Sequence, residues 1–147
     1  MKKKITKVFL ITVLVIAVCL TVFLLIFNTS SNKLKRYLKS EGYTCNKTLC
    51  TKKIKTTQYQ INYKKCYYHY EDDDLTIDIS KEKTLVQPVN KITACTFHKK
   101  DDNKLTTFTD ADSSSNCLIY LEKVNIEVNN FKDILKEAKV DFNKLSK

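Results

Sequence analysis

The chain has 147 residues and a formal net charge of +10, and it contains a single glycine. One glycine excludes the glycine-rich loops that bind phosphates and dinucleotides. Arg36 is the only arginine, so the basic charge lacks the planar guanidinium groups on which specific nucleic-acid recognition depends. We therefore expect no cofactor and no nucleic-acid partner, and the sequence contains no catalytic motif.

The chain begins with an apolar segment long enough to cross a bilayer. Residues 8–27 carry no charge, and a helix of that length spans about 30 Å, the thickness of the hydrocarbon core. The lysines before it favour a cytoplasmic N-terminus. We predict a cytoplasmic tail over residues 1–7, a transmembrane signal-anchor helix over residues 8–27, a linker over residues 28–32 and an extracytoplasmic domain over residues 33–147.

Two alternatives to this topology stay open. A signal peptide cleaved after Ser30 or Ser31 would release the domain, although the apolar segment is longer than the core of most signal peptides. The opposite orientation would place the domain inside the cell, because the basic residues after the apolar segment nearly balance those before it. These residues are Lys33, Lys35, Arg36 and Lys39.

Hydrophobic periodicity in the domain indicates a short helix followed by strands. Leu34 and Leu38 lie one helical turn apart and Gly42 follows them, which predicts a helix from Asn32 to Glu41. Alternating apolar residues then indicate half-buried strands. The expected elements are a long strand over 54–63, a turn at 71–74, a strand at 75–79, a connection over 81–90, strands at 92–98 and 105–109 around a turn at 99–104, a turn at 110–116 and a long strand over 118–128.

Apolar residues near the C-terminus recur at helical spacing. They predict an amphipathic helix that begins at Asn129 or Asn130 and covers the sheet. Its apolar positions are Phe131, Ile134, Leu135, Ala138, Phe142 and Leu145. The predicted fold class is α+β: an N-terminal transmembrane helix, a short helix, an antiparallel β-meander of about five to seven strands, and a covering C-terminal helix.

Five cysteines follow the apolar segment, which is typical of an exported domain stabilised by disulfides. They are Cys45, Cys50, Cys66, Cys95 and Cys117. Cys45 and Cys50 flank a loop of the length common in hairpins, so we predict a bond between them. Three pairings are open among the others. The hairpin that begins at Cys66 resembles the one that begins at Cys95, which favours a Cys66–Cys95 bond and leaves Cys117 over.

A domain inside the cell would instead use these residues for metal binding or redox sensing. Two Cys-x-x-His units supply a possible Cys2His2 zinc set, Cys66, His69, Cys95 and His98. Residues three apart on a strand point to opposite faces, so each unit would need a bend in its strand. Zinc knuckles usually make that bend with glycine, which neither unit contains, so disulfides are the preferred interpretation.

A cluster of tyrosines lies beside Lys64 and Lys65. Its members are Tyr63, Tyr67, Tyr68 and Tyr70. Exposed tyrosines of this kind bind glycans or partner proteins. The commoner arrangement is a strand tyrosine that packs on the core with its hydroxyl at the rim, so the cluster is a candidate binding surface with core packing as the alternative.

Anchor, cysteines and the lack of catalytic residues together predict a function in binding. The hypothesis is a single-pass cell-membrane protein whose extracytoplasmic domain binds an unknown protein or envelope component without catalysis. Abundant Lys, Asn and Ile are typical of an AT-rich bacterial genome, which points to a bacterial cell envelope. The alternative is an intracellularly facing zinc-binding or redox-sensing domain.

Overall fold

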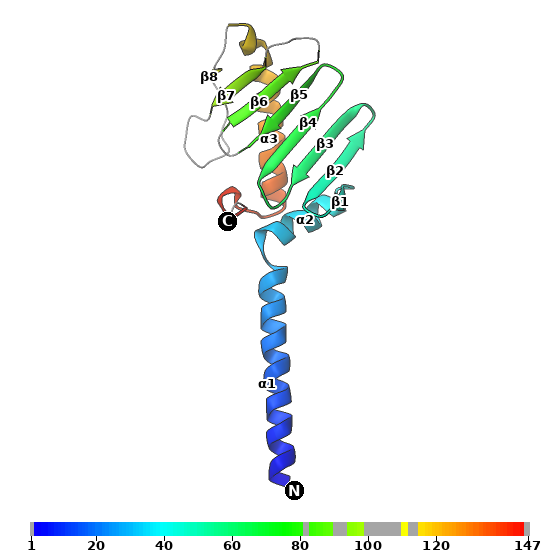
Figure 1. The fold of residues 1–147 in the computed structure, drawn as a ribbon, viewed down its shortest axis with the longest axis vertical. Helices are drawn as coiled ribbons and strands as arrows, with labels where there is room; N and C mark the ends of the chain where they lie inside the picture. The colour runs from blue at the N-terminus through cyan, green and yellow to red at the C-terminus, as the bar shows by residue number, and fades with distance from the viewer. Residues whose placement is uncertain (1, 81–82, 90–93, 99–109, 112–114, 146–147) are drawn as a thin grey trace.

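The computed structural model describes residues 2–80, 83–89, 94–98, 110–111 and 115–145. Figure 1 shows a long helix, α1 (Lys2–Phe27), that carries a domain at its C-terminal end. Within α1 the stretch Phe9–Phe27 has a mean hydropathy of 3.2 and none of it is buried inside the protein. By length and composition, α1 is therefore able to cross a membrane, as the sequence predicts.

The helix α2 (Ser30–Ser40) begins inside the predicted linker and is bonded to the end of α1. The guanidinium of Arg36 donates a hydrogen bond to the Phe27 carbonyl at 2.9 Å, and the Asn32 amide donates to the Ile26 carbonyl at 2.7 Å. The last carbonyls of a helix have no partner within it. These two side chains supply the partners and fix α2 against α1.

The expected short helix is present, and glycine ends it. Leu34 and Leu38 are fully buried on its inner face. Gly42 has a φ of 84°, a left-handed conformation that glycine adopts without strain. The backbone N–H of Tyr43 then donates to the carbonyl of Leu38 at 2.9 Å, which closes the helix and turns the chain into the sheet.

Among the described residues, eight strands form one sheet in which each strand pairs antiparallel with the next along the chain. The strands are β1 (Thr44–Asn46), β2 (Leu49–Ile54), β3 (Thr57–Asn62), β4 (Tyr67–Glu71), β5 (Leu75–Ile79), β6 (Lys83–Pro88), β7 (Cys95–His98) and β8 (Asp110–Ala111). The predicted meander is confirmed, and the short strands β1 and β8 form its two edges.

Two predicted elements in this region need correction. The strand expected over 54–63 is present as β3 but begins later, because Ile54 ends β2 and a turn with Lys55 at a φ of 55° precedes β3. Ile54 and Tyr59 are five residues apart, so one continuous strand would have placed them on opposite faces. The expected connection over 81–90 contains β6, which accommodates Pro88 at its last position, where the missing N–H costs little.

The sheet has one face packed on the core and one face that no described helix covers. Figure 1 shows α3 along the covered face. A buried row of paired residues crosses six strands on that side: Cys50, Ile61, Tyr68, Ile79, Thr84 and Phe97. Successive side chains of a strand point to opposite faces, so the residues that alternate with this buried row lie on the uncovered face.

The helix α3 (Leu121–Glu137) overturns the strand predicted over 118–128. A 3-10 helix, Ser115–Tyr120, precedes α3. Val124 and Val128 are fully buried, and Phe131 and Leu135 continue the stripe at helical spacing. Ile126, which strand alternation would place beside the two valines, is 46% exposed. The apolar residues of this segment fit both the two-residue period of a strand and the helical period of about 3.6 residues, and their burial follows the helical period.

The C-terminal helix covers the sheet as predicted but ends earlier than expected. It stops at Glu137, and Lys139 has a φ of 54° where the chain turns. Phe142 and Leu145 are buried all the same, because the chain folds back onto the core beyond the helix. The strand predicted at 105–109 and the turn at 99–104 lie outside the described residues. The predicted α+β arrangement is confirmed.

Candidate functional site

The first disulfide closes a hairpin at one edge of the sheet. β1 and β2 place Cys45 directly opposite Cys50, and their Cα atoms are 4.0 Å apart in the bonded pair. The bond predicted from the loop length is confirmed.

The second disulfide joins Cys95 on β7 to Cys117, just before α3, with Cα atoms 5.7 Å apart. The predicted Cys66–Cys95 bond is therefore wrong, and Cys117 is not left over. Cys66 lies in the turn before β4, and β4 is three strand spacings, about 14 Å, from β7. A disulfide does not reach that far. Cys66 is buried and belongs to neither of these bonds.

The structure also separates the four predicted zinc ligands. Cys95 is bonded to Cys117, and His69 lies on β4 beside Asp78 rather than beside β7. The backbone of His98 pairs with Lys83 on β6. Within the described ranges, no group of three or more His, Cys, Asp or Glu side chains is placed to hold a metal ion. The Cys95–Cys117 bond and the separation of β4 from β7 therefore do not support the predicted zinc set.

The four predicted tyrosines do not share one exposed surface. Tyr63, Tyr68 and Tyr70 are buried, whereas Tyr67 points to the uncovered face of the sheet and is half-buried. The Tyr63 hydroxyl donates to the backbone carbonyl of Lys47. Three of the four therefore pack in the core: the hydroxyls of Tyr63 and Tyr70 form part-buried hydrogen bonds, whereas the Tyr68 hydroxyl is itself buried.

An ionic cluster lies on the uncovered face of the sheet. Nδ1 of His69 is 2.5 Å from Oδ1 of Asp78, its Nε2 is 3.6 Å from Oε2 of Glu71, and the Tyr67 hydroxyl donates to Asp78. The hydrogen bond to Asp78 raises the pKa of His69 above its ordinary value, although burial opposes it. Burial raises the pKa of Asp78, but the hydrogen bonds from His69 and Tyr67 outweigh it and lower that pKa.

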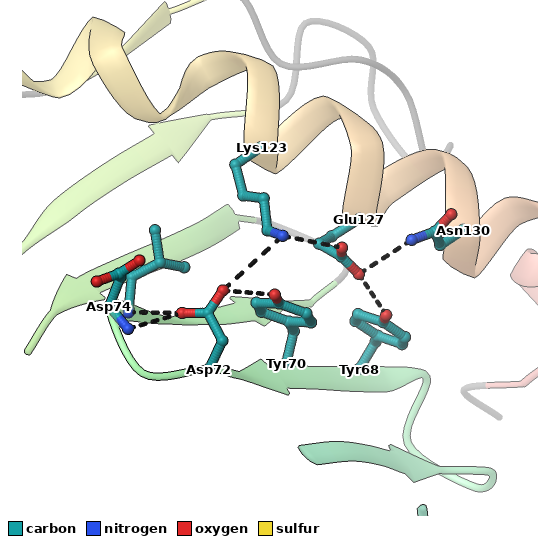
Figure 2. Close-up of polar contacts among 8 residues, drawn as sticks. Tyr68, Tyr70, Asp72, Asp74, Lys123, Glu127 and Asn130 are labelled. Atoms are coloured by element: carbon teal, nitrogen blue, oxygen red, sulfur yellow. Dashed lines mark hydrogen bonds and ion pairs between the residues drawn. The ribbon is translucent and has the colours of Figure 1, made fainter. Parts of the chain in front are cut away.

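A buried carboxyl group binds α3 to the sheet on the other face, as Figure 2 shows. Glu127 is 2% exposed, and its Oε2 accepts hydrogen bonds from the Tyr68 hydroxyl at 2.6 Å and the Asn130 amide at 3.2 Å. Nζ of Lys123 lies 4.0 Å from its Oε1. Burial and the charge of Glu127 raise the pKa of Tyr68, so its hydroxyl stays a donor.

Lys123 extends this network to the turn between β4 and β5. Its Nζ is 3.8 Å from Asp72 and 4.5 Å from the centre of the Tyr70 ring. Asp72 accepts the Tyr70 hydroxyl at 2.5 Å and the backbone N–H groups of Asp74 and Leu75. Burial raises the pKa of Asp72, but these donors and Lys123 outweigh it and lower that pKa.

A pocket of about 250 Å³ lies beside this network. Tyr43 in the connection between α2 and β1, the strands β2 to β4 and the second half of α3 form its walls. Its lining residues are Tyr43, Lys52, Ile54, Tyr59, Tyr68, Asn130, Asp133 and Ile134. The turn after Ile54 brings that residue and Tyr59 to the same face, so the pocket depends on the hairpin that the sequence did not predict.

Two tyrosine hydroxyls of the pocket have no hydrogen-bond partner among the described residues. Tyr43 is 9% exposed, and neither its hydroxyl nor that of Tyr59 forms a hydrogen bond within the part of the chain that the structure describes. Burial, together with nearby tyrosine and carboxyl groups, raises the pKa of Tyr43 to about 12. Burial and the charge of Glu127 raise the pKa of Tyr59 in the same direction. Both hydroxyls therefore keep their protons at neutral pH and are available as hydrogen-bond donors.

The sequence reasoning missed every charged residue of the network and the pocket. Glu127 was assigned to a strand, and the signal that would have identified it is helical: it lies three residues after Val124 on a stripe that is otherwise apolar. Tyr43 comes from the connection before β1, Lys52 from β2 and Asp133 from α3, so no local pattern links them.

Comparison with known proteins finds no matching family model, and no curated protein or solved structure that is similar to the chain.

Proposed function

We propose that this protein is a membrane-anchored binding domain of the bacterial cell envelope, with its N-terminus in the cytoplasm and its domain outside. The domain binds a protein or an envelope component and carries out no catalysis. The apolar helix α1 and two disulfides among the described cysteines support an exported, anchored domain.

The pocket is the observation that carries the binding role. Two hydroxyls in this pocket, those of Tyr43 and Tyr59, form no hydrogen bond within the described chain, so both are open to a bound partner. Asp133 and Ile54 at its walls are exposed, so a partner reaches the pocket without unfolding the domain. Binding sites are usually concave, largely apolar and lined by a few convergent polar groups.

The orientation is tested by labelling cysteines on intact cells with a maleimide that does not cross membranes, with and without an external reductant. We expect Cys45 and Cys50 to react only after reduction and without lysis. The matched control is a Cys45→Ser, Cys50→Ser variant, which loses that part of the signal. Labelling that requires lysis would overturn the extracytoplasmic placement.

The binding role is tested by a photo-crosslinking amino acid at the pocket. One variant carries it at Ile54, which is 49% exposed at the pocket wall, and the control carries it at Val89, which is 60% exposed after β6. We expect an envelope protein or polymer crosslinked from position 54 and absent from position 89. Equal capture at the two positions, or none at position 54, would reject the pocket as the binding site.

A further inference from the structure

We infer that the pocket binds a small amphoteric ligand, one with an ammonium group at one end and a carboxylate at the other, as in a free α-amino acid. This inference rests on the proposed function and names the ligand class of the same pocket. It follows from opposite charges on two of the pocket's walls and from the aromatic and apolar side chains that also line it.

The wall formed by α3 attracts an ammonium group. Asp133 lines the pocket, is exposed and forms no ion pair with any described residue. Glu127 lies behind the same wall, and its charge contributes to the raised pKa values of Tyr43 and Tyr59. The potential inside the pocket is therefore negative on this side. Aromatic faces add to the attraction for a cation.

The wall formed by β2 and β3 attracts a carboxylate. Nζ of Lys52 donates one hydrogen bond, to the Glu41 carbonyl at 2.7 Å, and lies 5.4 Å from the centre of the Tyr43 ring. An ammonium group has three N–H donors, so two remain for a ligand. The hydroxyls of Tyr43 and Tyr59 supply two further donors that have no acceptor in the described chain.

The arrangement disfavours ligands with one sign of charge. A phosphate would meet the carboxylate of Asp133 as well as a single lysine, and a divalent cation would meet the ammonium group of Lys52. Ile54 and Ile134 provide an apolar contact for a side chain. The volume of about 250 Å³ lies below that of pockets for drug-sized molecules, roughly 300–1,000 Å³. A compact zwitterion would pair with Lys52 and Asp133 and accept from the hydroxyls of Tyr43 and Tyr59, and it fits this size.

The test uses the full-length protein in detergent micelles with ¹³C-labelled tyrosines, read by NMR. Tyr43→Phe and Tyr59→Phe variants assign the two signals. The probes are leucine, leucinamide, which lacks the carboxylate, and 4-methylpentanoate, which lacks the ammonium group. We expect leucine to shift both signals at millimolar concentration, and each analogue to bind at least about tenfold more weakly, as expected for the loss of a charged hydrogen bond.

Matched variants then locate the two charges. Asp133→Asn should weaken the binding of leucine at least about tenfold and leave the binding of 4-methylpentanoate unchanged. Lys52→Met should also weaken the binding of leucine at least about tenfold and leave the binding of leucinamide unchanged. Glu122→Gln removes an equal charge from the exposed first turn of α3, and it should leave leucine binding unchanged. Leucyl-leucine distinguishes a peptide from a free amino acid, because tighter binding of the dipeptide would identify a short peptide as the source.

Failure of leucine and of the dipeptide to move the two tyrosine signals would overturn this inference, as would binding of an analogue as tight as that of leucine. Crosslinking from position 54 is an independent readout. Capture there, together with no amino-acid binding, would reject the amphoteric ligand and retain the binding domain.

Discussion

The carboxyl group of Glu127 accepts hydrogen bonds from Tyr68 on β4 and from Asn130 on α3. Its removal should therefore lower the free energy of unfolding. In a Glu127→Ala variant the buried Tyr68 hydroxyl loses its acceptor. We expect the free energy of unfolding to fall by about 2–3 kcal/mol, the cost of leaving such a group unpaired.

The matched control for Glu127 is Glu122→Ala on the exposed first turn of the same helix, which should change the free energy of unfolding by no more than about 0.5 kcal/mol. Urea unfolding of the full chain in micelles, followed by tyrosine circular dichroism, measures both variants. Equal losses would show that the network of Figure 2 does not hold α3 on the sheet.

His69 makes stability depend on pH. Its folded-state pKa is raised above 6.5 by Asp78 and Glu71, so its stabilising charge is fully present below pH 6.5 and is lost as pH rises through the folded pKa. The folded-state pKa of Asp78 is lowered below 3.8, so its contribution is present above pH 3.8 and is lost as pH falls through that lower value. We expect the melting temperature to be highest between these limits.

A pH series of thermal melts measures this dependence, with His69→Gln as the control. The variant should lose the decline on the alkaline side and keep the decline on the acidic side. An NMR titration that places the pKa of His69 below 6.5 would contradict the ion pair on the uncovered face.

At the scale of elements, local sequence patterns predicted the helices, strands and disulfides whose contacts are between residues close in the sequence. Leu34, Leu38 and Gly42 predicted α2, the strict alternation from Leu75 to Ile79 predicted β5, and loop length predicted the Cys45–Cys50 bond. The Cys95–Cys117 bond and the pocket depend on how distant elements pack, so residue spacing did not identify them. The segment 118–128 was misassigned because its apolar residues fit two periods and only burial distinguishes them.

One pair of substitutions tests the helical assignment of that segment. In a strand, Ile126 and Val128 would share a face; in α3, Val128 is fully buried and Ile126 is 46% exposed. Val128→Ala should lower the free energy of unfolding by about 2 kcal/mol. Ile126→Ala removes more atoms and should cost less than about 0.5 kcal/mol. Similar losses, measured by urea unfolding, would favour the strand.

At the scale of the whole molecule, α1 continues without a break to Phe27 and α2 begins at Ser30. Cleavage after Ser30 or Ser31 would cut the first turn of α2. We therefore expect the mature protein to remain in the membrane fraction with its full mass of 17.1 kDa. Mass spectrometry of fractionated cells measures this, and soluble protein beginning at residue 31 or 32 would contradict an uncleaved anchor.

The bonds from Asn32 and Arg36 to the last carbonyls of α1 have a mechanical consequence. A flexible tether would let the domain tumble above a bilayer and sample a wide hemisphere. With this junction, torque applied to α1 is transmitted to α2 and through it to the sheet. The junction therefore limits the tilt of the domain relative to α1, and with it the range of distances between the pocket and a membrane that α1 crosses.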